Sequence, residues 1–330
     1  MAALTDTFKR TINYVRISVT DRCDFRCVYC MAEDMTFIPR KDVLSFEQIE
    51  LISQAFVELG VTSIRLTGGE PLIRKNIVDL VAKLNQLDGL NEITMTTNGS
   101  QLPQLAHGLK QAGLSRLNIS LDSLKPERFK ELTRTGDLQN VLVGIEAAKQ
   151  AGFDRIKLNA VILRGRNDDE ILDLVKFVRD QGIDISFIEE MPLGHIVEHD
   201  RSLAFMSSDD VRETIAQSYN IEPSEHTSSG PSRYWQFQSH SNSRLGFISP
   251  HSHNFCHECN RVRVTATGKL LLCLGNEHSV DLKQIMEQSE QPLLAVKQAI
   301  SDAMHIKPER HHFDLEDDVQ IVRFMNATGG

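Results

Sequence analysis

Long apolar segments are absent from this sequence of 330 residues, and their absence excludes one class of protein. No run of about 18 apolar residues occurs, so the sequence predicts no transmembrane helix. The first ten residues, MAALTDTFKR, contain no apolar core of a secretory signal peptide, which favours a cytoplasmic protein. Hydrophobic residues still make up 41% of the chain, which is enough for a buried core.

Positive charge is also scarce. Lys and Arg number 36 against 45 Asp and Glu, which gives a net charge of −9. Affinity for a nucleic-acid backbone comes largely from basic side chains on phosphates, so this balance gives no general support for a nucleic-acid partner. A few arginines that converge in a pocket can still bind a small anion on an acidic protein.

Cysteines are few, but their placement is informative. Six cysteines in a chain expected in a reducing compartment indicate metal or redox chemistry rather than a disulfide framework. They form two groups of three, one near each end of the chain: Cys23, Cys27 and Cys30, then Cys256, Cys259 and Cys273.

The first group lies in DRCDFRCVYC, with the spacing C-x3-C-x2-C, in a loop after a predicted strand. A closed structural zinc site requires four ligands, and this loop contains no histidine. Soft thiolates also suit iron–sulfur clusters. Three of them leave one iron of a [4Fe–4S] cluster without a protein ligand and open to a small molecule.

The second group has the spacing C-x2-C-x13-C, and spacing alone favours structural zinc, with His251, His253 or His257 as fourth ligand. Arg261 and Arg263 follow at once and alternate on what we expect to be one face of a strand. Two cations beside a thiolate-ligated centre are suited to binding an anion there.

Short β-type runs alternate with amphipathic helical segments over the first 190 residues. This alternation predicts a parallel sheet, because parallel neighbours need crossover connections. A doubly wound sheet and a full or partial β/α barrel both fit the periodicity. The expected strands are 14–20, 63–67, 92–98, 116–121, 155–163 and 184–191, and the expected helices are 45–59, 76–87, 102–112, 138–151 and 169–181.

Several local signals refine this organisation. SFEQ at 45–48 has the spacing of a capping box, and Gly60, Gly113, Gly152 and Gly182 each follow a helical segment, as helix-ending glycines do. Residues 222–233 are rich in Ser, Pro and Gly and predict a loop near a loose boundary at 200–225. TATGKLLLC predicts a hairpin, and helices at 282–287 and 292–304 are expected to pack back on the body.

A glycine-rich turn follows the second predicted strand. In TGGEP, residues 67–71, the glycines allow close backbone approach to a ligand, and Glu70 can accept a hydrogen bond from an ammonium group.

The first cysteine group, with aromatic Tyr29 before its last cysteine, resembles the signature of the radical S-adenosylmethionine superfamily. The whole series of motifs resembles, more narrowly, the GTP 3′,8-cyclase family of molybdenum cofactor biosynthesis. The matching stretches span nearly the whole chain: RISVTDRCDFRCVYC, IRLTGGEPLIRK, TTNG, NISLDSL, KLNAVI, FIEEM, FCHECNRVRVTATGKLLLCL and a terminal Gly-Gly.

The resemblance implies a partial (β/α)6 barrel at residues 1–200 and a C-terminal region, 201–330, that carries a second cluster. Each cysteine group is then expected to hold one [4Fe–4S] cluster with an open iron. S-adenosylmethionine is expected at the first cluster and the guanine of GTP at the second. In the family, a 5′-deoxyadenosyl radical removes hydrogen from ribose C3′, and the carbon radical attacks C8 to give (8S)-3′,8-cyclo-7,8-dihydroguanosine 5′-triphosphate.

The same resemblance assigns individual residues. Catalytic roles fall to the first three cysteines with Arg261 and Arg263. S-adenosylmethionine is assigned to Tyr29, Gly69, Ser120 and Met191, and GTP to Arg16, Arg65, Thr96, Lys157, Arg261, Val262 and Arg263. The implied partners are an electron donor, a downstream cyclic pyranopterin monophosphate synthase and a second copy of the chain in a homodimer.

One position departs from the family. An arginine usually precedes FIE, whereas this chain has Ser186, so either a neighbouring cation compensates or triphosphate affinity is lower. The family also implies that the Gly-Gly end, within 328–330, reaches the active site. The alternatives are another radical enzyme with an auxiliary cluster, such as a peptide modifier, and a zinc-stabilised binding module.

Overall fold

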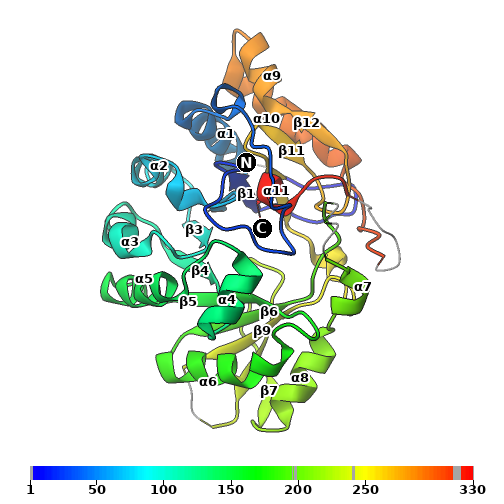
Figure 1. Cartoon of the computed structure of the whole chain (residues 1–330). Helices are drawn as coiled ribbons and strands as arrows, with labels where there is room; N and C mark the ends of the chain where they lie inside the picture. The colour runs from blue at the N-terminus through cyan, green and yellow to red at the C-terminus, as the bar shows by residue number, and fades with distance from the viewer. Residues whose placement is uncertain (1–2, 195, 197–198, 240–241, 315–320, 330) are drawn as a thin grey trace.

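Twelve strands form one sheet in the part of the chain described by this computed structural model, which covers residues 3–194, 196, 199–239, 242–314 and 321–329 (Figure 1). The first six strands are parallel and adjacent in chain order, so the parallel sheet predicted from the sequence is confirmed. They are β1 (Tyr14–Ser18), β2 (Ser63–Thr67), β3 (Glu92–Thr97), β4 (Arg116–Ser120), β5 (Ile156–Val161) and β6 (Asp184–Ile188). A doubly wound sheet reverses its strand order at a switch point, and this order does not reverse, so the winding is that of a partial barrel.

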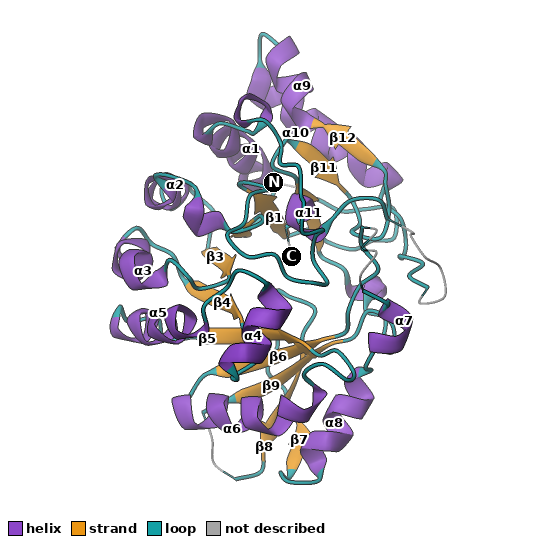
Figure 2. Ribbon diagram, viewed as in Figure 1, coloured by secondary structure: helices purple, strands orange, loops and turns teal. Residues whose placement is uncertain are grey.

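Helices connect these strands and lie outside them (Figure 2). The five expected from the sequence are confirmed, most with slightly shorter bounds: α1 (Phe46–Glu58), α2 (Ile77–Leu84), α3 (Leu102–Gln111), α5 (Leu138–Gln150) and α6 (Ile171–Gln181). A further helix, α4 (Pro126–Thr133), was not predicted. It is short and buries only Phe129, Leu132 and Thr133, so its apolar pattern in the sequence is weak.

The predicted helix ends are confirmed. Ser45 accepts from the backbone N–H of Gln48 at 3.2 Å, and the Gln48 side chain accepts from the backbone of Ser45 at 2.9 Å, which forms the capping box. Gly182 ends α6 with a φ of 67°, a conformation that side-chain-bearing residues rarely adopt.

The C-terminal third of the chain extends the sheet at both edges. β9 (Arg244–Ile248) runs parallel to β6 and pairs in antiparallel fashion with β8 (Arg233–Phe237), which pairs with β7 (Ile221–Pro223). At the other edge β10 (Arg261–Val264) runs parallel to β1, followed by β11 (Lys269–Leu271) and β12 (Ser279–Asp281). The hairpin predicted in TATGKLLLC is thus confirmed. The division into 1–200 and 201–330 stays a prediction.

The remaining helices are α7 (Arg201–Ala204), α8 (Ser208–Ala216), α9 (Leu282–Gln288), α10 (Pro292–Ala303) and α11 (Met325–Thr328), with 3-10 turns at Arg40–Asp42, Pro71–Ile73, Asp168–Glu170, Cys256–Glu258 and Met304–Ile306. As predicted, α10 packs on the body, where Lys297 donates to Glu58 of α1 at 2.7 Å. The last helix, α11, lies near the middle of the molecule in the view of Figure 1. No helix among the described residues is long and apolar enough to cross a membrane.

Strand alternation sorts the side chains of β1 into two environments. Val15 and Ile17 are fully buried beneath the helices, whereas Tyr14 and Arg16 line the cavity inside the barrel. The same alternation on the neighbouring strands gives the barrel an apolar outer layer and a polar, positively charged interior.

Candidate functional site

The parallel register brings cations from three strands together in the barrel interior. Arg16 on β1 is the partner of Arg65 on β2 and of Arg263 on β10. The cavity is also lined by Lys157 of β5 and by Arg261 of β10. Among the described residues, none of these five cations forms an ion pair with a carboxylate. All five were predicted from the sequence, and the structure brings them to one cavity.

Neutral groups from the protein partly satisfy these cations. Arg65 donates to the Tyr14 hydroxyl and to Thr96 Oγ1, the latter at 3.3 Å, and Lys157 lies 3.3 Å from the Tyr234 hydroxyl. Burial lowers the pKa of Lys157. Burial raises the pKa of Tyr14, but the charges of Arg65, Arg16 and Arg261 outweigh it and lower that pKa to about 8. The cavity therefore favours an anionic ligand.

The first cysteine group lies in the loop that follows β1. Burial raises the pKa of all three thiols, to about 12 for Cys30 and well above the usual value for Cys27. A buried thiolate is costly unless positive charge is beside it, and a bound metal supplies that charge. Three such thiols from one loop fit the ligand set of the implied cluster.

The second group lines the cavity with all three of its cysteines, Cys256, Cys259 and Cys273. No three His, Cys, Asp or Glu side chains in the described part of the chain converge closely enough to ligate one metal ion. A [4Fe–4S] cluster does not require such convergence, because each cysteine binds a different iron. Each group offers three cysteine thiols, and three thiols fit a [4Fe–4S] cluster with one open iron.

The glycines of the TGGEP turn pack against the cysteine loop. A Cβ on Gly68 would lie 2.3 Å from the carbonyl oxygen of Thr20, and one on Gly69 would lie 2.4 Å from that of Arg22. The close backbone approach predicted for these glycines is therefore made to protein. The N–H of Gly69 donates to the carbonyl oxygen of Thr20 at 2.8 Å.

Glu70 holds two functional turns together. Its carboxylate accepts from the backbone N–H groups of Leu72 at 2.8 Å and Asn98 at 2.6 Å and from Thr97 Oγ1 at 2.7 Å. Asn98 in turn donates to Asp24 in the cysteine loop at 2.6 Å. Glu70 therefore joins the TGGEP and TTNG turns to the cysteine loop, where we expected it to receive an ammonium group.

Replacing Glu70 by Gln is expected to lower the free energy of unfolding by about 1–3 kcal/mol, because one acceptor oxygen becomes a donor that faces other donors. Urea unfolding of the anaerobically purified protein measures this change. Glu131→Gln on the exposed side of α4 is the matched control. Equal stability of the two variants would contradict the role of Glu70.

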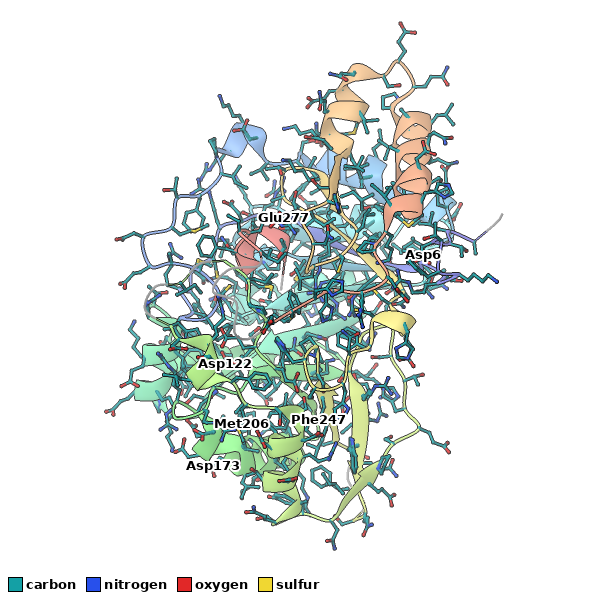
Figure 3. All side chains as sticks on the ribbon, turned by 90° about the vertical axis from the view of Figure 1, so that its right-hand side faces the viewer. Asp6, Asp122, Asp173, Met206, Phe247 and Glu277 are labelled. Carbon is teal, nitrogen blue, oxygen red and sulfur yellow. The ribbon has the colours of Figure 1, made fainter. Side chains whose placement is uncertain are left out.

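Of the residues assigned to S-adenosylmethionine, Tyr29 lies in the loop of the first group and Gly69 packs against that loop. The Tyr29 hydroxyl donates to Asp122 at 2.7 Å, and Asp122 also accepts from the backbone N–H of Val161 at 2.9 Å. β4 ends at Ser120, and Asp122, labelled in Figure 3, lies two residues further along the chain. Met191 lines the cavity. Sequence reasoning missed Asp122, although its place in NISLDS, after a strand, could have indicated it.

Several buried polar atoms have no hydrogen-bond partner among the described residues. Arg16 Nε and Asn159 Oδ1 belong to residues that line the cavity, and Asp21 Oδ1 and Asn326 Oδ1 lie where the C-terminal segment meets the first cysteine loop. Buried polar groups in folded proteins are nearly always paired, so this set indicates a polar ligand.

Ser186, the departure from the family, is fully buried. Its hydroxyl lies 2.8 Å from the hydroxyl of Ser232, and a Cβ on neighbouring Gly246 would lie 2.5 Å from it. No guanidinium fits at this position unless Ser232 moves. Two other arginines, Arg116 and Arg155, line the cavity, and Arg116 is paired with Glu92 at 2.6 Å.

The C-terminal segment enters the site. Arg263 Nη1 donates to the carbonyl oxygen of Gly329 at 2.5 Å, and Asn326 Nδ2 donates to that of Asp21 at 2.9 Å. Asn326 and Thr328 are buried. Gly330, the last residue of the implied tail, lies outside the described residues.

Comparison with known proteins agrees with this arrangement. Residues 17–178 match the model of the radical SAM superfamily, and residues 183–313 match that of Molybdenum Cofactor Synthesis C. A protein of Pseudomonas putida (strain W619) called GTP 3′,8-cyclase is 60% identical over 328 residues, which cover 99% of this chain and 98% of the relative. A relative of the same name from Marinobacter nauticus is 58% identical, again over 99% of this chain and 98% of the relative.

Among solved structures, SuiB of Streptococcus suis bound to the precursor peptide SuiA aligns with a TM-score of 0.60 at 18% identity. The alignment covers 90% of this chain, which spans 65% of the SuiB chain. The S-adenosylmethionine-bound form of SuiB aligns with a TM-score of 0.58 at 19% identity, over 83% of this chain and 64% of SuiB. These likenesses confirm the fold. From the family models and the relatives of about 60% identity together, the chain belongs to the radical SAM superfamily and, within it, to the GTP 3′,8-cyclase family.

Proposed function

We propose that this chain converts GTP to (8S)-3′,8-cyclo-7,8-dihydroguanosine 5′-triphosphate in molybdenum cofactor biosynthesis. The observation that carries the proposal is a cavity in which five cations without carboxylate partners among the described residues lie beside three cysteines. A triphosphate supplies the missing negative charge, and relatives of about 60% identity bear the name of this activity.

The residues around the first cysteine group bind and orient S-adenosylmethionine in this proposal. When bound, the first [4Fe–4S] cluster and S-adenosylmethionine supply the acceptor for a hydrogen atom of the substrate. The Gly69 carbonyl accepts from the ammonium group of the methionine moiety, and Ser120 and Met191 contact the remainder. Asp122 fixes the Tyr29 ring through its hydrogen bond at 2.7 Å.

The cations of the barrel hold the substrate. Arg16, Arg65 and Lys157 bind the phosphates, with Thr96 offering a hydroxyl, while Arg261, Val262 and Arg263 hold the nucleotide beside the second cysteine group. Holding both reactants in fixed positions converts a bimolecular step into an effectively unimolecular one. Arg263 also fixes Gly329, which brings the C-terminal segment to the cavity.

Further parts of the proposal come from the family alone. They are an external electron donor, a downstream cyclic pyranopterin monophosphate synthase, a homodimer and a cytoplasmic location.

Anaerobic incubation with GTP, S-adenosylmethionine and a reductant tests the activity. We expect 5′-deoxyadenosine and the cyclised nucleotide to form together. The purified protein should be brown and contain about eight irons, as two [4Fe–4S] clusters require. Consumption of S-adenosylmethionine only when a peptide is added would favour the peptide-modifying alternative, and a colourless zinc protein would favour the binding module.

Replacing Lys157 by Met is expected to weaken GTP binding by about 10- to 100-fold, as loss of a hydrogen bond to a charged group does. The free energy of unfolding without GTP should not fall, because an uncompensated buried charge is removed. Calorimetric titration with GTP and with guanosine measures the effect, and guanosine binding should be unchanged. Lys176→Met on the surface of α6 is the control, and equal GTP affinity of the two variants contradicts the assignment.

A further inference from the structure

A segment distant in sequence contacts the second cysteine group. Residues 307–311, KPERH, follow the turn Met304–Ile306. The Lys307 ammonium donates to the carbonyl oxygen of Leu272 at 2.6 Å and lies 3.7 Å from Cys259 Sγ. Leu272 immediately precedes Cys273, so one buried ammonium, 3% exposed, reaches one cysteine sulfur and the backbone that carries a second.

His311 contacts the remaining cysteine of the group, Cys256. Its Nδ1 lies 3.0 Å from Cys256 Sγ. A cysteine sulfur that ligates a metal has no proton to donate, so in the loaded protein Nδ1 carries the hydrogen. Nε2 has a partner whether or not it is protonated, because Asn254 Nδ2 lies 3.2 Å away and the carbonyl oxygen of Pro250 lies 3.0 Å away.

Arg10 holds this segment in place. It is 8% exposed, pairs with Asp6 at 2.6 Å and donates to the carbonyl oxygens of Pro308 at 2.7 Å and Glu309 at 2.6 Å. It also donates to the carbonyl oxygen of Cys256 at 2.8 Å. Asp6, labelled in Figure 3, is itself buried. The guanidinium therefore fastens the 307–311 segment to the loop of Cys256, which fixes the distances from Lys307 and His311 to the sulfurs.

The charged side chains nearest the sulfurs differ in sign between the two cysteine groups, although Arg26 also donates to the carbonyl oxygen of Cys23 at 2.6 Å. Carboxylates lie near the first, with Glu70 and Asp24 close to Cys23 and Asp122 close to Cys27. Cations lie near the second, where Lys307 and Arg261 are close to Cys259. Buried charges are screened weakly, so this difference acts on whatever the sulfurs bind.

We propose that Lys307 and His311 are positioning residues of the second cluster, which hold two of its cysteine sulfurs and make it easier to reduce. Reduction adds one negative charge to the cluster, and hydrogen bonds to the sulfurs and nearby positive charge stabilise the reduced form. The inference rests on the proposed function in one respect, that the second cysteine group holds a [4Fe–4S] cluster.

The test uses the full-length chain with Cys23, Cys27 and Cys30 replaced by Ala, so that only the second cluster gives an electron paramagnetic resonance signal. Into this background go Lys307→Met, His311→Leu and His311→Asn, whose amide can take the place of Nδ1. Lys269→Met removes the same charge from the exposed surface of β11, and His312→Leu alters an exposed neighbour. The readouts are the midpoint potential, the iron content and the rate of iron loss to a chelator.

Lys307→Met is expected to lower the equilibrium constant for one-electron reduction at least tenfold, a shift of about 59 mV to more negative potential. His311→Leu should shift it less in the same direction, His311→Asn should recover most of that shift, and both controls should stay at the background value. Faster iron loss from a folded Lys307→Met protein also supports the holding role.

Unchanged midpoint potentials in Lys307→Met and His311→Leu, with full iron, would overturn the inference. If Lys307→Met does not fold, the difference between His311→Leu and His311→Asn decides, because equal potentials in that pair overturn it too. If the protein with Cys23, Cys27 and Cys30 replaced by Ala binds no iron, the result contradicts the proposed function instead, because the second cysteine group then holds no cluster. About four iron atoms per chain in that protein would show that the second cluster is present, and the midpoint potentials then test the inference about Lys307 and His311 alone.

Discussion

Replacing Cys27 by Ala is expected to abolish the formation of 5′-deoxyadenosine and, with it, the cyclised nucleotide, by at least about 10³-fold in rate. Only three thiols serve the first site, and all three, Cys27 among them, are partly buried. Loss of one ligand leaves two, too few to hold a cluster that already has an open corner. Product analysis by liquid chromatography and an iron assay on the anaerobic protein measure both effects.

Cys273→Ala is the matched variant at the other group, and its expected result differs. Iron should fall by about half in both variants, because each loses one of two clusters. S-adenosylmethionine cleavage should nevertheless continue in Cys273→Ala, uncoupled from cyclisation of GTP. Retention of cyclised product in Cys273→Ala, or equal loss of 5′-deoxyadenosine in both variants, would contradict the division of labour between the two groups.

The sequence predicted the barrel strands and the cysteine groups because both depend on local patterns. Residues 156–159, IKLN, alternate apolar and polar side chains, and Cys23, Cys27 and Cys30 lie within eight positions, so neither pattern requires knowledge of the fold. The strand ends were less accurate. β6 ends at Ile188, three residues before the predicted end, because the chain leaves the sheet at Glu189, whose carboxylate accepts from Ser208 and His251.

Residues that act through tertiary contact were not predictable in this way. Lys307 and His311 lie 48 and 55 residues from the cysteines that they contact, and Arg10 lies 246 residues from Cys256. Nothing in the local sequence KPERH marks a lysine that folding buries. Tyr14 and Tyr234 present the same difficulty, because each looks like an ordinary strand aromatic and only the folded sheet brings its hydroxyl to a cation.

The predicted role of the TGGEP glycines illustrates a second limit. A glycine pair in a turn indicates that some group approaches closely, but the sequence does not say which. We expected a ligand, and the structure instead places the cysteine loop there, with Thr20 and Arg22 in the space that a Cβ would take. The motif therefore packs the TGGEP turn tightly against the loop that carries the first three cysteines.

A single methyl group added at Gly329, the penultimate residue, is expected to have a large effect. Gly329 has a φ of 75°, and a Cβ there would lie 2.2 Å from Cγ2 of Thr67, at the end of β2 beside the TGGEP turn. Gly329→Ala must therefore expel the terminal segment from the cavity or distort it. The carbonyl that accepts from Arg263 at 2.5 Å then moves away.

We expect Gly329→Ala to lower the rate of nucleotide cyclisation at least about 100-fold, the cost of misplacing a group by about 1 Å in an active site. Cleavage of S-adenosylmethionine should change less, because Gly329 itself contacts Arg263 and Thr67, whereas the contacts of the terminal segment with the first cysteine loop are made by Asn326, three residues earlier. Ala327→Gly, two residues earlier in α11, is the control, because it makes the terminal segment more flexible without adding a Cβ that collides with Thr67. Deletion of residues 329 and 330 should match Gly329→Ala.

Thr67→Ser in the Gly329→Ala background tests the steric cause, because it removes the methyl group with which the new Cβ collides. Partial recovery of cyclisation is expected, since the collision is relieved while the cost of an alanine at positive φ remains. Full activity in Gly329→Ala alone, or in the chain without residues 329 and 330, would show that the terminal segment fills the cavity without serving the reaction. Arg263 would then hold the nucleotide without help from the tail.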